Sequence, residues 1–301
     1  MEYYEGREHI MGTVFRLHAF HEPGRGQWMR DLADSLFDTL QEDDERLSIF
    51  KTGSIINRIN AAAGAEPVPV DEDTFELFVA ARQWWEFTGG LFDITIGAIM
   101  RSFGYYHNAP LPPGEPPPAD KLPELTGCDK LELDAQNKTV RLARKGMMAD
   151  LGGFAKGWAV QGRGDILRRA GLSNFVISAG TSTVMAAGAP PGEDGWPTEL
   201  EDYGASQLEL DSLMLSNESV SVSANYRNTR SGPGGITIRH IMNPRTFEPV
   251  QQVRRVVVVG PRADDGEALS TALLIQGSSE GVFSMATRPE IKVHFDFPPE
   301  G

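Results

Sequence analysis

The residue types and spacing best suited to chemistry occur in a glycine-rich segment from Ala149 to Trp158 (ADLGGFAKGW). In this segment, Gly152 and Gly153 precede Lys156 at the point where a helical pattern begins. Glycines let the backbone come close to a ligand, N–H groups at a helix N-terminus point toward it, and lysine adds a positive charge. These are the physical parts of a phosphate cradle, although neither a Walker A loop nor a GxGxxG fingerprint is present. A tight strand-to-helix turn with an exposed lysine is the alternative interpretation.

Glu267 and Thr271 form a second candidate pair, at the expected start of the last helix. Because they are four residues apart, their side chains share one helix face, and a carboxylate and a hydroxyl there can reach one hard cation. Acidic residues also collect in first helical turns, where they interact favourably with the helix dipole. Helix capping is therefore the alternative explanation of Glu267.

Three further polar residues stand where regular elements are expected to end. His240 lies at the end of an expected strand and precedes the turn at Pro244. It is either a ligand of the site or an ordinary satisfied histidine. Asp93 and Thr95 lie on one side of an extended segment after a helix. They form either a ligand wall or an Asx-type turn.

The elements that must position these residues are mixed in kind. Apolar periodicity predicts helices around 28–40, 72–88, 154–170 and 267–276, the second of them capped by Asp71. Strands are expected at 9–20, 130–133, 139–142, 175–178, 207–215, 219–223, 236–242 and 253–260. The segment 107–124 holds seven prolines and is expected to be an irregular connection, as is 189–204. Strands outnumber helices without regular alternation, which favours an α+β fold over a doubly wound sheet.

Composition limits the possible partners. The chain has 301 residues with 28 basic and 42 acidic side chains, so its net charge is 28 − 42 = −14. Binding to nucleic acid or to an anionic membrane surface is disfavoured, because both need a cationic face. The sole cysteine, Cys128, excludes disulfide frameworks, zinc ribbons and CxxC redox chemistry. No apolar run approaches the roughly 20 residues of a membrane span. The length suits a single unit over residues 1–301, built as two intertwined subdomains.

The order and spacing of six segments together resemble the ApbE family of FAD:protein FMN transferases. The matching segments are Met11–Thr13 (MGT), Ser54–Asn60 (SIINRIN), Thr88–Gly97 (TGGLFDITIG), Asp150–Val160 (DLGGFAKGWAV), His240–Thr246 (HIMNPRT) and Glu267–Leu273 (EALSTAL). The resemblance as a whole spans the chain from about residue 10 to 295. Six ordered motifs are far more specific than any one of them.

The resemblance implies an α+β fold related to the T-fold, with mixed or antiparallel sheets and packed helices. It implies FAD as the substrate, Mg²⁺ as the cofactor, and as partner an acceptor flavoprotein whose threonine or serine receives FMN while AMP is released. Some members of the family instead hydrolyse FAD to FMN and AMP. Phosphoryl transfer depends on charge neutralisation and alignment, so a glycine-lysine cradle and a metal are its expected parts.

The resemblance also assigns residues by position. The implied metal ligands are the Ala155 carbonyl oxygen and the side chains of Glu267 and Thr271. The implied FAD contacts are Met11, Asp93, Thr95, Asp150, Gly153, Lys156, Gly180 and Thr181. Lys156 and His240 are the implied catalytic residues, with His240 facing the phosphates to transfer a proton or to position them.

Three positions depart from the family pattern. Glu267 replaces an aspartate, Thr181 replaces the second glycine of a pair, and Phe247 replaces a glycine. Two alternatives therefore stay open: a paralogue that binds or hydrolyses FAD with weakened transferase activity, and a non-catalytic interaction protein on the same fold. The first residues are charged and contain no apolar leader segment. We expect a cytoplasmic protein from the sequence as written, or an extracytoplasmic one if a leader has been trimmed.

Overall fold

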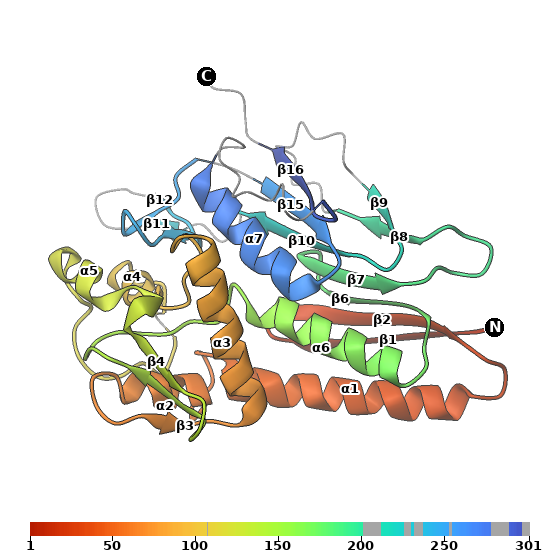
Figure 1. Cartoon of the computed structure of the whole chain (residues 1–301), viewed down its shortest axis with the longest axis horizontal. Helices are drawn as coiled ribbons and strands as arrows, with labels where there is room; N and C mark the ends of the chain where they lie inside the picture. The colour runs from red at the N-terminus through yellow and green to blue at the C-terminus, as the bar shows by residue number, and fades with distance from the viewer. Residues whose placement is uncertain are drawn as a thin grey trace.

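A seven-stranded antiparallel sheet occupies the centre of the molecule, with strand order β1-β2-β6-β7-β10-β15-β16 (Figure 1). The computed structural model describes residues 1–106, 108–200, 212–225, 230–231, 237–252, 255–277 and 289–296. The strands of this sheet are β1 (Glu2–Ile10), β2 (Thr13–His21), β6 (Asn174–Ala179), β7 (Thr183–Ala187), β10 (Ser219–Ala224), β15 (Arg255–Gly260) and β16 (Lys292–Asp296).

The remaining elements are helices and short strand pairs. The helices are α1 (Gly26–Leu47), α2 (Ile55–Ala61), α3 (Glu72–Phe87), α4 (Gly97–Ser102), α5 (Leu122–Leu125), α6 (Ala155–Arg169) and α7 (Ala263–Gln276), with 3₁₀ turns at Ala119–Lys121 and Cys128–Lys130. The short strands are β3 (Val68–Pro69), β4 (Leu131–Asp134), β5 (Thr139–Leu142), β8 (Trp196–Glu199), β9 (Ser212–Leu215), β11 (Arg230–Ser231), β12 (Thr237–Ile238), β13 (Met242–Asn243) and β14 (Glu248–Pro249). This is the α+β organisation that the sequence predicts.

Helices α1, α6 and α7 pack on one face of the large sheet (Figure 1). Leu36 and Leu40 of α1 and Val160 of α6 share a buried cluster with Phe15 and Phe175 of the sheet. The β8–β9 hairpin contributes Trp196 and Leu215 to a separate cluster on the opposite face. The sheet is therefore covered on both sides near its centre.

The sequence of strand β15 reflects its burial on both faces of the sheet. Val256 and Val258 belong to the cluster that contains α7, and Val257 and Val259 to the cluster on the opposite face. A strand that is buried on both faces needs an uninterrupted apolar run instead of alternation. The four consecutive valines of the sequence meet this need.

The elements α2 to α5 and β3 to β5 form a smaller lobe beside one end of the sheet, at the left in Figure 1. Asp71 caps α3, since its Oδ1 accepts a hydrogen bond of 2.8 Å from the Thr74 N–H. Gly89 and Gly90 follow this helix with positive φ, a conformation that glycine adopts without steric cost. The predicted start and end of α3 are thus confirmed.

The first strand prediction was wrong. Residues 9–20 are not one strand, because a two-residue turn at Met11 and Gly12 separates β1 from β2 and pairs Ile10 with Thr13. Both turn residues have positive φ, 51° and 71°, as a type I′ hairpin turn requires. Methionine rarely adopts a positive φ, so the sequence does not predict the turn.

The proline-rich connection contains more structure than expected. Residues 110–118 have no helix or strand, but α5 lies within the segment and places Pro123 in its first turn, where the missing N–H costs nothing. Strand β8 likewise lies within the expected irregular stretch 189–204. Some predicted segments lie partly outside the described residues. These parts are His107, residues 201–204 of the irregular stretch, and residues 207–211, 236 and 253–254 of three predicted strands.

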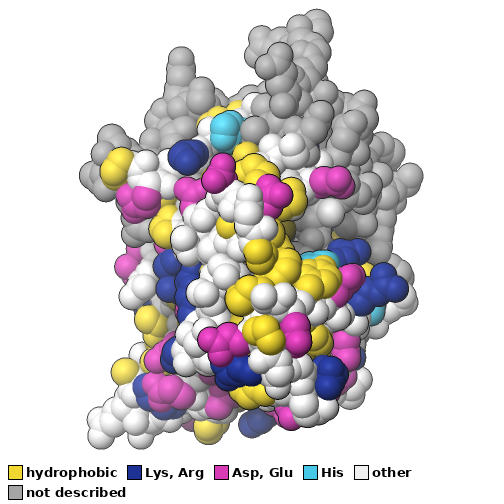
Figure 2. Space-filling view, turned by 90° about the vertical axis from the view of Figure 1, so that its right-hand side faces the viewer, with side chains coloured by type: hydrophobic (Ala, Val, Ile, Leu, Met, Phe, Trp, Pro, Cys, Tyr) yellow, Lys and Arg dark blue, Asp and Glu magenta, His cyan; other side chains and the backbone are white. Residues whose placement is uncertain are grey.

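The surface drawn in Figure 2 carries charges of both signs. Acidic side chains lie among the lysines and arginines on this face of the molecule. No helix within the described ranges is long and apolar enough to cross a lipid bilayer.

Candidate active site

A cavity of about 390 Å³ lies between the smaller lobe and the sheet. Its wall is drawn from distant parts of the sequence, namely the segment before α2, the segment after α3, the start of α6, β10, the segment before β13, and α7. The predicted site residues that line it are Asp93, Asp150, Gly153, Lys156, His240, Glu267 and Thr271. The volume is within the range of small-molecule sites. Seven of the predicted residues therefore meet around one space.

The glycine-rich segment enters the cavity immediately before α6. The Gly152 N–H donates to Asp150 Oδ1 at 2.8 Å, and a Cβ on Gly153 would find no atom within 4 Å. Lys156 lies in the first turn of α6, with Nζ 3.2 Å from the Gly152 carbonyl oxygen and 3.4 Å from Glu267 Oε1. The segment is thus a tight turn, as the alternative interpretation predicts. Its lysine, however, is paired with the Glu267 carboxylate in the cavity wall.

Glu267 does not cap its own helix, α7. Helix α7 begins at Ala263, so Glu267 is its fifth residue and lies beyond the first turn. The side chain is buried with 7% of its residue surface exposed, and Oε2 accepts a hydrogen bond from the Gly157 N–H of α6. The prediction of a helix start at 267 was wrong by four residues. The structure places the carboxylate across the interface between α6 and α7.

Thr271 lies one helical turn beyond Glu267 and lines the same cavity. Its Oγ1 is 3.1 Å from Ser223 Oγ of β10, which is in turn 2.8 Å from Ser270 Oγ. These hydroxyls hold the Thr271 side chain against the sheet. Neither Ser223 nor Ser270 was singled out from the sequence, because their proximity depends on how α7 docks on β10.

The donor set suits a hard cation. Glu267 offers a carboxylate and Thr271 a hydroxyl, and oxygen donors of this kind are those that Mg²⁺ prefers. Ala155, whose carbonyl is the third implied ligand, is the first residue of α6 and is buried outside the cavity wall. No cluster of three or more His, Cys, Asp or Glu side chains suited to a metal occurs in the part of the chain that the structure describes.

Asp93 and Thr95 form a hydrogen-bonded turn, and Asp93 also lines the cavity. Asp93 Oδ1 accepts hydrogen bonds from the Thr95 N–H at 2.7 Å and the Thr95 hydroxyl at 2.6 Å, and the Cys128 thiol lies 3.3 Å away. Asp93 faces the cavity, whereas Thr95 is fully buried behind it and also accepts the Gly127 N–H. Burial raises the pKa of Asp93, and the hydrogen bonds oppose this shift. Thr95 and Cys128 therefore support Asp93 from behind.

The other predicted flavin contacts lie outside the cavity wall. Met11 occupies the β1–β2 turn, and Gly180 donates its N–H to the Val14 carbonyl oxygen at 2.9 Å. Gly180 has a φ of 59°, and Thr181 after it is exposed. The next residue, Ser182, does line the cavity. The structure thus places this turn next to the site without bringing Gly180 or Thr181 into its wall.

His240 lines the cavity and is half-buried, two residues before β13. It lies outside any strand, contrary to the predicted strand over 236–242. Phe247, a departure from the family pattern, lies in the β13–β14 connection with a φ of 61° and packs against the core. Glycine is favoured in that conformation. Phe247 therefore replaces glycine at a strained turn and not in the cavity wall.

Three residues that support the site have no role there in the predictions from the sequence. Asn60 joins α2 to the glycine-rich segment, since its amide bonds the Ala149 N–H at 2.7 Å and the Ala149 carbonyl at 2.9 Å. The Tyr106 hydroxyl donates to Asp150 Oδ2, and Phe50 exposes its ring to the cavity. The motif that contains Asn60 was a usable signal. Tyr106 and Phe50 lie outside every motif.

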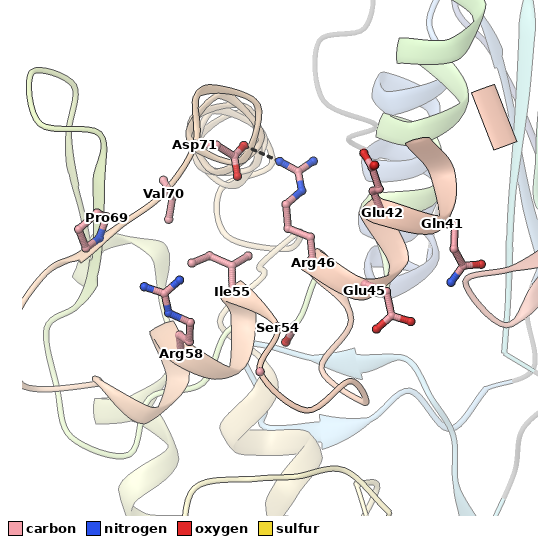
Figure 3. A pocket seen from close by; sticks show the side chains of 11 residues that line it. Gln41, Glu42, Glu45, Arg46, Ser54, Ile55, Arg58, Pro69, Val70 and Asp71 are labelled. Atoms are coloured by element: carbon pink, nitrogen blue, oxygen red, sulfur yellow. Dashed lines mark hydrogen bonds and ion pairs between the residues drawn. The ribbon is translucent and has the colours of Figure 1, made fainter. Parts of the chain in front are cut away.

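A larger cavity of about 630 Å³ lies between α1, α2 and the segment that leads into α3 (Figure 3). Arg46 in its wall is paired with Asp71, as the dashed line in Figure 3 marks, and with Asp43 and Asp73 at 2.5 Å each. None of the predicted catalytic, flavin or metal residues lines this cavity. The smaller cavity is therefore the candidate active site.

Comparison with known proteins identifies the family of the chain. The ApbE family model matches residues 11–295. FAD:protein FMN transferases from Treponema pallidum and Vibrio cholerae are 26% and 23% identical to the chain, over 98% and 90% of its length and 84% and 81% of theirs. Both relatives are enzymes by name, as the sequence analysis expected.

Solved structures share the fold. The crystal structure of the ApbE protein from Thermotoga maritima matches with a TM-score of 0.81 at 24% identity, covering 99% of this chain and 97% of that one. The apo form of the flavinyl transferase ApbE from Pseudomonas stutzeri matches with a TM-score of 0.82 at 24% identity, covering 100% and 92%. The expected fold and enzyme class are confirmed. Since the family model spans nearly the whole length, the chain belongs to the ApbE family.

Proposed function

We propose that this protein transfers FMN from FAD to a threonine or serine hydroxyl of an acceptor flavoprotein and releases AMP. The observation that carries the proposal is the meeting of α6 and α7 at the cavity. Lys156 Nζ lies 3.4 Å from Glu267 Oε1, and Thr271 follows one turn later on the same wall. A cation and hard oxygen donors are thus concentrated beside the glycine-rich turn, where a pyrophosphate needs them.

Glu267 and Thr271 in the cavity wall would hold Mg²⁺, whereas Ala155, the third ligand that the resemblance implies, lies outside that wall. The ion would neutralise charge on the pyrophosphate and polarise the phosphorus–oxygen bond that breaks. The close packing of the Glu267 carboxylate against Gly157 supports Glu267 in this role. A Cβ added to Gly157 would lie 2.5 Å from Glu267 Oε2, so glycine at 157 keeps the space that the carboxylate occupies.

The reaction needs one bond to form and one to break. The acceptor hydroxyl oxygen bonds to the flavin-side phosphorus of FAD, and the bond from that phosphorus to the bridging oxygen breaks, so AMP leaves with this oxygen. The hydroxyl proton must pass to a base, and His240 in the cavity wall is our candidate. Lys156 is placed to balance the charge of the phosphates.

The departures from the family pattern are compatible with activity. Thr181 and Phe247 lie outside the cavity wall, so neither fills the space for FAD. Glu267 keeps a carboxylate in the wall and fits against α6. These placements favour a working transferase over the weakened paralogue and the non-catalytic protein.

The test is incubation of the pure protein with FAD, Mg²⁺ and a flavoprotein domain that carries a flavin-accepting threonine. We expect covalent flavin fluorescence on the acceptor in a denaturing gel and an equal amount of AMP. AMP without label would indicate an FAD pyrophosphatase, and bound FAD without either product would indicate a binder. A protein with no affinity for FAD would contradict the proposal altogether.

Two matched variants test the metal assignment in the same assay. Thr271→Ala removes the hydroxyl and should lower Mg²⁺-dependent turnover by at least about a hundredfold while FAD still binds. Thr271→Ser keeps the hydroxyl and should retain most of the activity. Full activity in the alanine variant would refute the role of Thr271 at the metal.

A further inference from the structure

Tyr106 lies behind the cavity wall and is almost fully enclosed, with 3% of its surface exposed. It follows α4 and is not itself part of the wall, whereas its neighbour Tyr105 is. Its hydroxyl donates to Asp150 Oδ2, and the other oxygen of Asp150 accepts the Gly152 N–H at 2.8 Å. Both carboxylate oxygens are therefore fixed by donors from the protein.

The Tyr106 ring has a second neighbour in the wall. It meets the Phe50 ring edge-on, with 6.1 Å between centroids and 65° between planes. Phe50 is 51% exposed and lines the cavity. Tyr105 packs on Tyr106 from another side at 5.9 Å. Tyr106 thus touches a polar and an apolar residue of the wall at once.

The chemistry of Tyr106 suits a permanent donor. Burial and the neighbouring Asp150 carboxylate raise its pKa well above the ordinary value, so the phenol stays protonated over the physiological range. A carboxylate held in this way presents its remaining lone pairs in a fixed direction. Phosphate oxygens are repelled by it, so it selects a ligand group that donates N–H or O–H.

We propose that Tyr106 is a positioning residue for FAD recognition, which acts through Asp150 and supports Phe50 without touching the ligand. This inference rests on the proposed function, in which the cavity binds FAD. The carboxylate takes a donor group of the dinucleotide, while Lys156, six residues further along the chain on the same cavity wall, serves the phosphates. No sequence motif of the chain contains Tyr106.

The test is a double-mutant cycle on FAD affinity, measured by quenching of flavin fluorescence at equilibrium. Tyr106→Phe keeps the ring and removes only the hydroxyl, and we expect the Kd to rise about tenfold, which corresponds to about 1.4 kcal/mol. In the Asp150→Asn background the same substitution should change the Kd less than about twofold, because the partner of the hydroxyl has already been altered. An equal change in both backgrounds would mean that Tyr106 acts only through general stability.

Tyr3→Phe is the matched control. It also removes a tyrosine hydroxyl, which hydrogen-bonds His18 Nδ1 at 2.6 Å on the exposed β1–β2 hairpin. We expect its Kd for FAD to equal that of the wild type. If the wild type binds FAD and Tyr106→Phe binds it equally well, the inference is overturned while the proposed function stands. If the wild type does not bind FAD, both are overturned together.

Discussion

The Glu267 side chain spans the space between α7 and α6. One oxygen accepts the Gly157 N–H and the other lies 3.4 Å from Lys156 Nζ. Both contacts depend on the reach of glutamate, because aspartate is one methylene shorter. The family resemblance predicts aspartate at this position. In this chain the spacing between α6 and α7 accommodates the longer glutamate.

We therefore expect Glu267→Asp to lower activity. The shorter side chain withdraws its carboxylate from Gly157 and displaces the proposed metal ligand, and octahedral Mg²⁺ tolerates such displacement poorly. AMP release should fall by at least about tenfold, with a higher Mg²⁺ requirement. Glu42→Asp, the same exchange at an exposed position of α1, should leave both unchanged. A Glu267→Asp enzyme as active as the wild type would show that the contact with Gly157 is dispensable.

Asp93 gives a prediction about pH. Burial raises its pKa, so the folded protein keeps this proton at pH values where the unfolded chain has lost it. Between the unfolded value near 3.9 and the raised folded value, the free energy of unfolding must fall as pH rises. Asp93→Asn removes this titration and can still accept from Thr95. We expect the variant to gain stability over the wild type as pH rises through this window.

The measurement is urea unfolding of both proteins from about pH 3 to about pH 7. The difference between their free energies of unfolding should grow across the window of Asp93 and then stay constant. A difference that does not vary with pH would show that the buried carboxylate has an ordinary pKa.

At the scale of elements, the site depends on how closely α6 approaches α7. A Cβ on Gly157 would lie 2.5 Å from Glu267 Oε2 and 2.9 Å from the Ala263 carbonyl oxygen. Real Cβ atoms do not come so near to backbone atoms, so the helices must move apart if Gly157 is enlarged. Movement by a few tenths of an ångström would also disturb the pairing of Lys156 with Glu267.

Gly157→Ala should therefore destabilise the protein by about 1 to 3 kcal/mol, as overpacking at a close helix contact does. Gly162 provides the control in the same helix, because a Cβ there meets nothing within 4 Å. Gly162→Ala should be neutral or stabilise by up to about 1 kcal/mol, since alanine favours the helix. Denaturant midpoints measure both, and equal effects would contradict the close approach.

At the scale of the whole molecule, the sequence was most informative where a motif was local. The cap at Asp71, the valine run of β15 and the glycine-rich turn before α6 all had the structure that their residues predict. The predicted start of α7 is wrong because an acidic residue, which commonly marks a helix start, lies beyond the first turn of this helix. The β1–β2 turn was missed because methionine rarely adopts a positive φ.

The supporting contacts of the site were beyond prediction. Tyr106 meets Asp150 and Ser223 meets Thr271 across 44 and 48 positions of the sequence. Such pairs follow from how the lobe and the helices pack on the sheet, and no short pattern encodes them. The residues that we propose as FAD contacts lie within sequence motifs, whereas the residues that hold them in place are distributed over the fold.

The distribution of the cavity wall along the chain has a consequence for timing. Asp93, Asp150 and Lys156 are synthesised long before Glu267 and Thr271, and the last two lie on the final helix of the described chain. A growing polypeptide therefore carries the glycine-rich turn without the carboxylate and hydroxyl that complete it. Domains acquire their function only when distant segments have docked, and synthesis proceeds at about 5 to 20 residues per second. The proposed metal ligands Glu267 and Thr271 are therefore absent from the growing chain until α7 has been synthesised.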